Sequence, residues 1–252
     1  MIIGFVVTAL TALTTFSTAA GSVPKLIPPL CTLGQETLTS MGNTVEILDY
    51  RPQAIEDSFG IFIKDLYNQS KGNLKSLLLF YIKTVVFAPQ RYKREVNFKK
   101  FRDQYYKLSP VIFDDKTINN MDLKYDVYFY GSDQVWNPVI THGLCPAYFG
   151  VPFDKDAIHA SYAASIGLNH LNGDDETFKE YLKNLDYIAV REETAKDLLQ
   201  PLTDKNIEIV LDPTLLLEKS KWEKMLHPIN RKNDYILYNY DYDYELENFK
   251  KE

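Results

Sequence analysis

A short apolar run that ends in a glycine and a cluster of polar side chains constrains the fold of this chain more than any other segment. Residues 125–130 (YDVYFY) are rich in apolar, β-forming side chains, which is typical of a strand buried on both faces. Gly131 permits the turn that follows. The loop then offers a hydroxyl, a carboxylate and two amides, on Ser132, Asp133, Gln134 and Asn137. Ligands of open α/β sheets bind just beyond such strand ends, so the segment predicts a site for a sugar or a phosphate.

The same loop has a structural interpretation, which spacing alone leaves equally open. Asp133 can cap a helix, and Asn137 with Pro138 can form a turn. Trp136 can be a stacking wall for a ligand or part of the core.

Two further predicted strands end in residues suited to a site. Residues 159–164 lead into a small-residue turn that runs from Ser165 to Gly167, where backbone amides can approach a ligand or simply pack tightly. Residues 187–190 predict another strand, with Arg191 at its end and a helix after it. A guanidinium there can hold a carboxylate or a phosphate in a forked pair, or it can pair with a neighbouring glutamate.

Three of these segments resemble the polysaccharide pyruvyl transferase family: GSDQVWN (131–137), YFG (148–150) and SYAASIG (161–167). Weaker similarities follow the order of the family, at 38–52, 187–193, 211–217 and 235–240. The resemblance covers roughly residues 38–240.

The resemblance implies an α/β fold with a Rossmann-like parallel sheet, as the first half of a glycosyltransferase-B-like two-domain architecture. It implies transfer of a pyruvyl group from phosphoenolpyruvate to a sugar of a cell-surface polysaccharide, as a ketal. The expected partners are phosphoenolpyruvate and a glycan or lipid-linked sugar acceptor, with no metal and no cofactor. The substrate-binding residues expected at the strand ends are Gly131, Ser132, Asp133, Gln134, Asn137, Ser165, Gly167 and Arg191. No catalytic residue is assigned, although Asp133 is the one conspicuous loop carboxylate available as a base.

The resemblance also divides the chain. Residues 1–37 are an atypical N-terminal segment, 38–218 a Rossmann-like domain, and 219–252 a linker helix with the start of a second domain. In the family the second domain carries much of the donor site, so we expect either an incomplete pyruvyl transferase or a non-catalytic Rossmann-like domain that binds a glycan or nucleotide-sugar. Residues 2–8 favour a first strand over a signal peptide, because the uncharged segment 1–24 lacks the basic start of a signal.

Composition and charge argue against some kinds of partner and site. A net charge of -6 argues against a nucleic-acid partner. The two cysteines, Cys31 and Cys145, lie far apart and form no metal motif, which favours the reducing cytoplasm. None of the four histidines shows ligand spacing, and we expect His159 to be structural or exposed rather than a base.

Residues 55–107 are expected to be helical. The apolar run 77–88 predicts a buried helix that ends at Pro89, rather than stable insertion in a membrane. The basic stretch from Arg91 to Lys107 is expected to be a solvated helix face, with a groove for an acidic polysaccharide or a membrane surface as the alternative.

Overall fold

The structure, a computed structural model, describes residues 1–8, 30–59, 61–151 and 153–225. The strands are β1 Ile2–Thr8, β2 Thr44–Tyr50, β3 Leu108–Phe113, β4 Val127–Tyr130, β5 Ile158–Ser161, β6 Ile188–Val190 and β7 Ile207–Ile209. The α-helices are α1 Leu30–Ser40, α2 Gln53–Phe59, α3 Lys64–Ser70, α4 Leu74–Tyr105, α5 Asp175–Leu182, α6 Glu193–Leu199 and α7 Lys219–Met225. The predicted segment 235–240 lies outside the described residues.

Every strand pair in the described structure is parallel. Five strands form one sheet in the order β3-β2-β1-β4-β5, and β6 pairs with β7. Isolated bridges from Ala160 to Tyr187 and from Ala164 to Val190 attach β6 to β5. The strand order reverses between β1 and β4, as in doubly wound folds, where ligands bind at that switch point. The predicted Rossmann-like parallel sheet is therefore confirmed.

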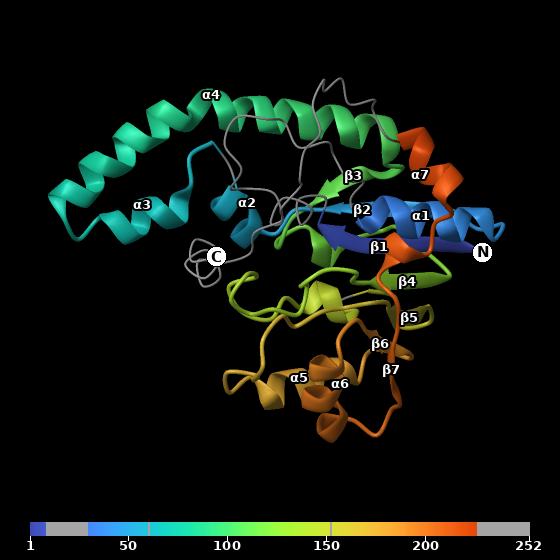
Figure 1. Cartoon of the computed structure of the whole chain (residues 1–252). Coiled ribbons are helices and arrows are strands. Elements are labelled where there is room, and N and C mark those ends of the chain that lie inside the picture. Colours follow the sequence, from blue (N-terminus) through green and yellow to red (C-terminus); the bar gives the residue numbers. More distant parts are fainter. Residues whose placement is uncertain (9–29, 60, 152, 226–252) are drawn as a thin grey trace, which may run out of the picture.

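The sheet separates two groups of helices. In Figure 1, α4 runs along the side of the molecule next to β3, whereas α5 and α6 lie at the opposite end near β6 and β7. β1 lies at the centre, where Ile3 is fully buried, and it covers the segment predicted as the first strand. Because successive strands are parallel, their carboxyl ends all meet at one edge of the sheet.

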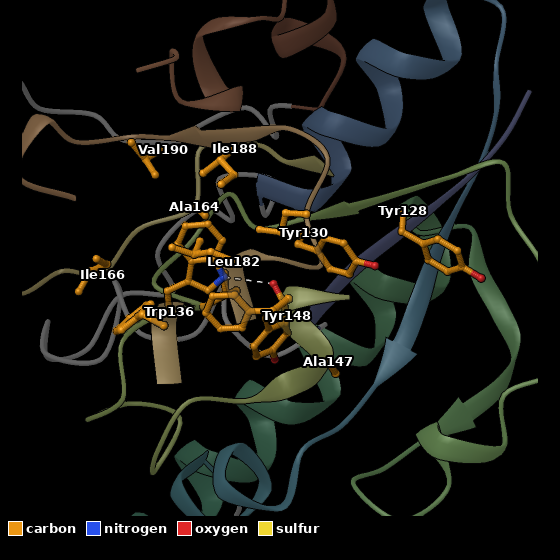
Figure 2. Close-up of a cluster of buried hydrophobic side chains, with 14 of the residues drawn as sticks. Tyr128, Tyr130, Trp136, Ala147, Tyr148, Ala164, Ile166, Leu182, Ile188 and Val190 are labelled. Carbon is orange, nitrogen blue, oxygen red and sulfur yellow. Dashed lines mark hydrogen bonds between the residues drawn. The ribbon is translucent and has the colours of Figure 1, made fainter. Parts of the chain in front are cut away.

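The largest core cluster lies under the loop that follows β4 (Figure 2). Trp136 is fully buried, stacks on Phe149 with ring centroids 4.9 Å apart, and donates its indole N–H to the carbonyl of Tyr148 at 3.1 Å. Trp136 is therefore core and not a stacking wall for a ligand. His159 is structural, as predicted, because it is buried in β5 and its Nδ1 lies 2.6 Å from the hydroxyl of Tyr130.

The expectations for α4 were partly wrong. The helix does not end at Pro89 but continues for sixteen residues, to Tyr105. One proline removes a single backbone hydrogen bond, and here the unpaired carbonyl belongs to Val85, on a solvent-exposed side of the helix where water can bind it. Most of the run 77–88 is not buried either, since Leu78 and Val85 are 61% and 74% exposed and Phe80 is its one buried residue. Within the described residues, no helix has the length and apolar character needed to span a bilayer.

Candidate functional site

The loops after β4 and β5 are joined into one unit by backbone hydrogen bonds. The amide of Ser165 donates to the carbonyl of Asp133 at 3.0 Å, and the amide of Trp136 donates to the carbonyl of Ser165 at 3.2 Å. Just below them, the amide of Tyr162 donates to the carbonyl of Tyr130 at 3.0 Å. The two predicted turns therefore lie side by side at the carboxyl edge of the sheet.

The end of β6 lies beside these two loops and continues the row of strand ends at the carboxyl edge of the sheet. The amide of Arg191 donates to the carbonyl of Ala164 at 3.1 Å, which places the start of the Arg191 side chain beside the β5 loop. One step earlier, the hydroxyl of Ser161 both accepts from the amide of Ala189 at 2.9 Å and donates to its carbonyl at 3.1 Å. The Ser161 side chain thus bonds the backbone of one residue between the two bridges that join β5 to β6.

Gly131 is required where β4 ends. Its φ is +117°, in the region that side chains avoid. A Cβ atom there would lie 3.0 Å from the Tyr162 carbonyl oxygen and 3.0 Å from the Ala164 Cβ. The β4 and β5 loops therefore approach each other as closely as they do only because residue 131 has no side chain.

Two residues that are not glycine also have left-handed backbones in these loops. Ser132 has φ +71° and Ala163 has φ +51°, and both are fully buried. Each such conformation costs on the order of 1 kcal/mol and persists only where the surrounding packing requires it. The buried hydroxyls of Ser132 and Ser165 have no hydrogen-bond partner in the described part of the chain. Strain and unsatisfied polar atoms of this kind concentrate at functional sites.

Asp133 is the carboxylate with the most perturbed acidity in this row. Burial raises its pKa to about 6, and the nearby negative charges of Asp212 and Glu192 act in the same direction. A hydrogen bond of 2.8 Å from the amide of Gln134 and the positive charge of Arg191 oppose the rise. Asp133 does not cap a helix, since its side chain accepts only from this loop amide among the described residues. A carboxyl group with a pKa near neutrality is suited to proton transfer.

Arg191 is held between two carboxylates. Its Nε donates to Glu192 at 2.9 Å and its Nη1 donates to Asp212 at 3.2 Å. Burial opposes its charge, but the hydrogen bonds and charges of Glu192, Asp133 and Asp212 outweigh that effect and raise the pKa of Arg191. The side chain is 25% exposed, and Nη2 contacts no acceptor among the described residues. Arg191 therefore makes the neighbouring ion pair that the sequence left open and still presents N–H groups to solvent.

The amide side chains of the loop mainly bind each other. Asn137 is buried and donates to the side-chain oxygen of Gln134 at 2.7 Å, while its own oxygen accepts from the amide of Val139. Gln134 in turn lies against Gly167, where a Cβ atom would be 2.3 Å from the Gln134 oxygen. Gly167 has φ +63° and is exposed. Asn137 thus forms the predicted turn, and the Gln134 side chain lies against the β5 loop.

All eight predicted residues lie on one edge of the sheet, but they differ in access to a ligand. Those with some exposure are Asp133, Gln134, Gly167 and Arg191. Those that are buried are Gly131, Ser132, Asn137 and Ser165. The first group can touch a substrate directly, whereas the second shapes the loops that carry it.

Two acidic residues of this cluster were not predicted as part of the site. Asp212 follows β7, and Glu192 is one of the neighbouring glutamates that were considered only as partners for Arg191. The signal for Asp212 was its position after the next parallel strand, which brings it to the same edge. In the described part of the chain, no group of three or more histidine, cysteine or acidic side chains is arranged to hold a metal ion.

Comparison with known proteins identifies one family. The family model described as polysaccharide pyruvyl transferase matches residues 31–251 of the 252. No curated protein and no solved structure matches the chain. Because the match spans nearly all of the sequence, including every strand end described above except that of β1, the chain belongs to the polysaccharide pyruvyl transferase family.

Proposed function

We propose that the protein transfers the pyruvyl group of phosphoenolpyruvate to a sugar of a cell-surface polysaccharide. The observation that carries the proposal is a carboxyl group with a pKa of about 6, Asp133, within the electrostatic reach of the partly exposed guanidinium of Arg191. Family membership supports the reaction class. A cation for an anionic donor and a carboxylate for proton transfer are the two groups that this reaction needs most.

The proposed reaction joins both hydroxyls of a sugar diol to C2 of the enolpyruvyl group. The first hydroxyl adds to C2 while the methylene carbon takes up a proton and becomes a methyl group. The second hydroxyl then displaces the phosphate by breaking the bond between C2 and the phosphate oxygen. The products are a cyclic pyruvate ketal and inorganic phosphate, and the two hydroxyl protons account for the new C–H bond and for one proton released with phosphate.

Each accessible residue has a role in this scheme. Arg191 holds the carboxylate or the phosphate of the donor through its remaining N–H groups. Asp133, ionised above pH 6, accepts the proton of the attacking hydroxyl. Gln134 and the backbone at Gly167 line the acceptor side, where a sugar offers hydrogen-bonding hydroxyls.

The domain division and the location follow from the same proposal. We assign residues 38–218, together with β1 from the N-terminal segment 1–37, to the first Rossmann-like domain, and 219–252 to a linker helix and the start of a second domain. The acceptor is a glycan or lipid-linked sugar in the cytoplasm, where reduced cysteines such as the unpaired Cys145 are expected. No nucleic-acid partner is proposed.

The reaction can be tested in deuterated water. Purified protein is incubated with phosphoenolpyruvate and a panel of para-nitrophenyl glycosides, and phosphate release is followed by ³¹P NMR. If the pyruvyl group is transferred, the product should contain a new methyl group that carries one deuterium, and one phosphate should be released for each ketal formed. Binding of phosphoenolpyruvate without phosphate release would instead support the non-catalytic binding domain.

A variant separates donor binding from stability. Arg191→Ala is expected to weaken phosphoenolpyruvate binding at least tenfold, measured by calorimetry at a temperature where both proteins are folded. Arg91→Ala is the matched control, because Arg91 also donates to a partner within the protein, the carbonyl of Ile61, but lies on α4. Equal donor affinity in wild type and Arg191→Ala would remove Arg191 from the site.

A further inference from the structure

One side of α4 exposes an apolar surface that the described structure leaves largely uncovered, although one of its members, Tyr81, contacts the ring of Tyr67 in α3, with ring centroids 6.3 Å apart. Its members are between 47% and 82% exposed and are three or four residues apart, except for one adjacent pair and one interval of seven. We refer to them as the α4 stripe: Leu74, Leu78, Tyr81, Ile82, Val85 and Tyr92. At 3.6 residues per turn, this spacing places all six on one side of the helix. Single exposed apolar residues are ordinary, but a continuous row of six marks an interaction surface.

The opposite side of α4 is already occupied. Phe80 is 6% exposed and packs edge-on against Phe62, with ring centroids 5.2 Å apart, and against Tyr67 of α3. The asparagine cap at Asn73, which accepts from the amides of Lys75 and Ser76, fixes where the helix begins. The α4 stripe is therefore the outward side of a helix that is anchored by α3, and its exposure does not result from a frayed end.

The charge of α4 differs in sign from that of the whole chain. The helix contains eight lysine and arginine residues and two acidic residues, whereas the chain as a whole carries a net charge of -6. Lys93 and Lys100 are exposed and follow the α4 stripe on the same side of the helix. An exposed apolar side together with exposed lysine and arginine side chains on the same helix favours binding to an anionic lipid surface.

We propose that α4 docks the protein on the surface of an anionic lipid bilayer. The α4 stripe enters the boundary between headgroups and acyl chains, and the basic half of the helix contacts the lipid phosphates. A second copy of the chain fits this surface less well, because two basic helices would repel each other. The proposal concerns surface binding and agrees with the absence, among the described helices, of one that could span a bilayer.

The position of the helix fits this arrangement. In Figure 1 the first turns of α4, together with α3, project on the side toward which the strand arrows point. The carboxyl edge of the sheet, with Asp133 and Arg191, faces the same side. Because α4 lies next to β3 and the candidate site lies beside β4 to β6, a bilayer bound to α4 would leave the site uncovered. The binding itself does not depend on the proposed pyruvyl transfer, because lipid affinity can be measured without substrate.

The apolar contribution can be tested with vesicles. The protein is sedimented with vesicles of phosphatidylglycerol and phosphatidylcholine, and with vesicles of phosphatidylcholine alone. Wild type is expected to bind the anionic vesicles, and the double variant Leu78→Glu with Val85→Glu to bind at least tenfold more weakly. Leu215→Glu is the matched control, since Leu215 is 67% exposed and lies far from α4 in the sequence, in the turn after β7. All substituted residues are exposed, and circular dichroism confirms that each variant is folded.

The contribution of charge to vesicle binding is tested with a second pair of variants. Lys93→Glu with Lys100→Glu is expected to abolish the preference for anionic vesicles, while Lys155→Glu with Lys179→Glu, the same charge change at exposed positions elsewhere, preserves it. Three results would overturn the proposal: no binding to anionic vesicles, equal binding to neutral ones, or unchanged binding in the α4 variants. A concentration-dependent dimer that Leu78→Glu dissociates, without vesicle binding, would assign the α4 stripe to a second copy instead.

Discussion

At the scale of single residues, Asp133 combines two opposing effects. Burial raises its pKa to about 6, while Arg191 and the Gln134 amide prevent a larger rise. A carboxyl group in this state is a better base near neutral pH than an ordinary aspartate, but its ionisation costs the folded protein free energy.

Replacing Asp133 with asparagine should separate proton transfer from binding. The loop geometry is retained, because asparagine can still accept from the Gln134 amide. We expect kcat to fall by about 10² to 10⁴, the usual contribution of a general base. The rate of wild type should rise with pH through about pH 6, and the variant should lack that inflection. A pH–rate profile that keeps the inflection in Asp133→Asn would assign the base to another group.

The same substitution should stabilise the protein at neutral pH. The pKa of Asp133 is higher in the folded chain, about 6, than the ordinary 3.8, so between these values only the folded state still holds the proton. Wild type therefore loses stability as pH rises through this window, by about 2 to 3 kcal/mol, and Asp133→Asn does not. Urea unfolding of wild type and of Asp133→Asn at pH 4 and pH 7 measures the difference between their free energies of unfolding. That difference should be near zero at pH 4. A variant less stable than wild type at pH 7 would contradict this.

Gly131 provides a test of the close contact between the two loops. Gly131→Ala should cost about 2 to 5 kcal/mol, because the side chain meets both a strained φ and the neighbouring loop. Gly42→Ala is the control, with φ +88° and open space around it, and should cost about 1 kcal/mol from backbone strain alone. Chemical denaturation of both variants gives the comparison. An equal loss of stability in Gly131→Ala and Gly42→Ala would mean that the β4 and β5 loops can move apart freely.

At the scale of elements, two serine side chains supply hydrogen bonds between neighbouring strands, at places where one backbone amide has no backbone partner. Ser161 binds the backbone of Ala189 where β5 meets β6, and Ser109 accepts from the amide of Asp49 at the register shift between β2 and β3. Ser161→Ala and Ser109→Ala should each cost about 1 to 3 kcal/mol, since each leaves an amide without a partner. Of the two, Ser161→Ala alone should also weaken phosphoenolpyruvate binding, because β6 carries Arg191. Equal effects on donor affinity would show that β6 is held in place by other contacts.

Much of the element order could be predicted from the sequence. The strands β1, β4, β5 and β6 are apolar runs with clear ends, although β4 and β5 are shorter than expected. β3 was not predicted, since its sequence LSPVIF contains a proline and follows a long helix. The exposure of α4 was missed because an apolar run looks the same in sequence whether other elements cover it or not.

The candidate site was predictable as a location more than as a set of contacts. Polar residues that follow parallel strands must meet at one edge, which brought Asp133, Ser165 and Arg191 together. Burial decides which of them can touch a ligand, and it depends on packing between segments far apart in the sequence. The ion pair between Arg191 and Asp212 joins residues 21 positions apart and follows only from the pairing of β6 with β7.

At the scale of the whole molecule, β1 connects the two halves of the sheet. It pairs with β2 on one side and with β4 on the other. Ile3→Ala should therefore destabilise the entire protein, by about 2 to 5 kcal/mol, since Ile3 is fully buried. Ile2→Ala is the control, because Ile2 is on the same strand but is 48% exposed. It should lower the free energy of unfolding by less than about 1 kcal/mol. Circular dichroism and tryptophan fluorescence should report one common transition; two separate transitions would mean that the halves unfold independently.

The central position of β1 also affects how the chain folds during synthesis. Its partner on one side, β4, lies more than a hundred residues further along, as the contact of Ile2 with Asp126 shows. At ribosomal speeds of about 5 to 20 residues per second, β1 therefore waits on the order of ten seconds with that edge unpaired. An unpaired apolar strand can associate with other nascent chains. The same strand that unites the finished sheet is thus the segment most exposed to aggregation, and to chaperones, while the protein is being made.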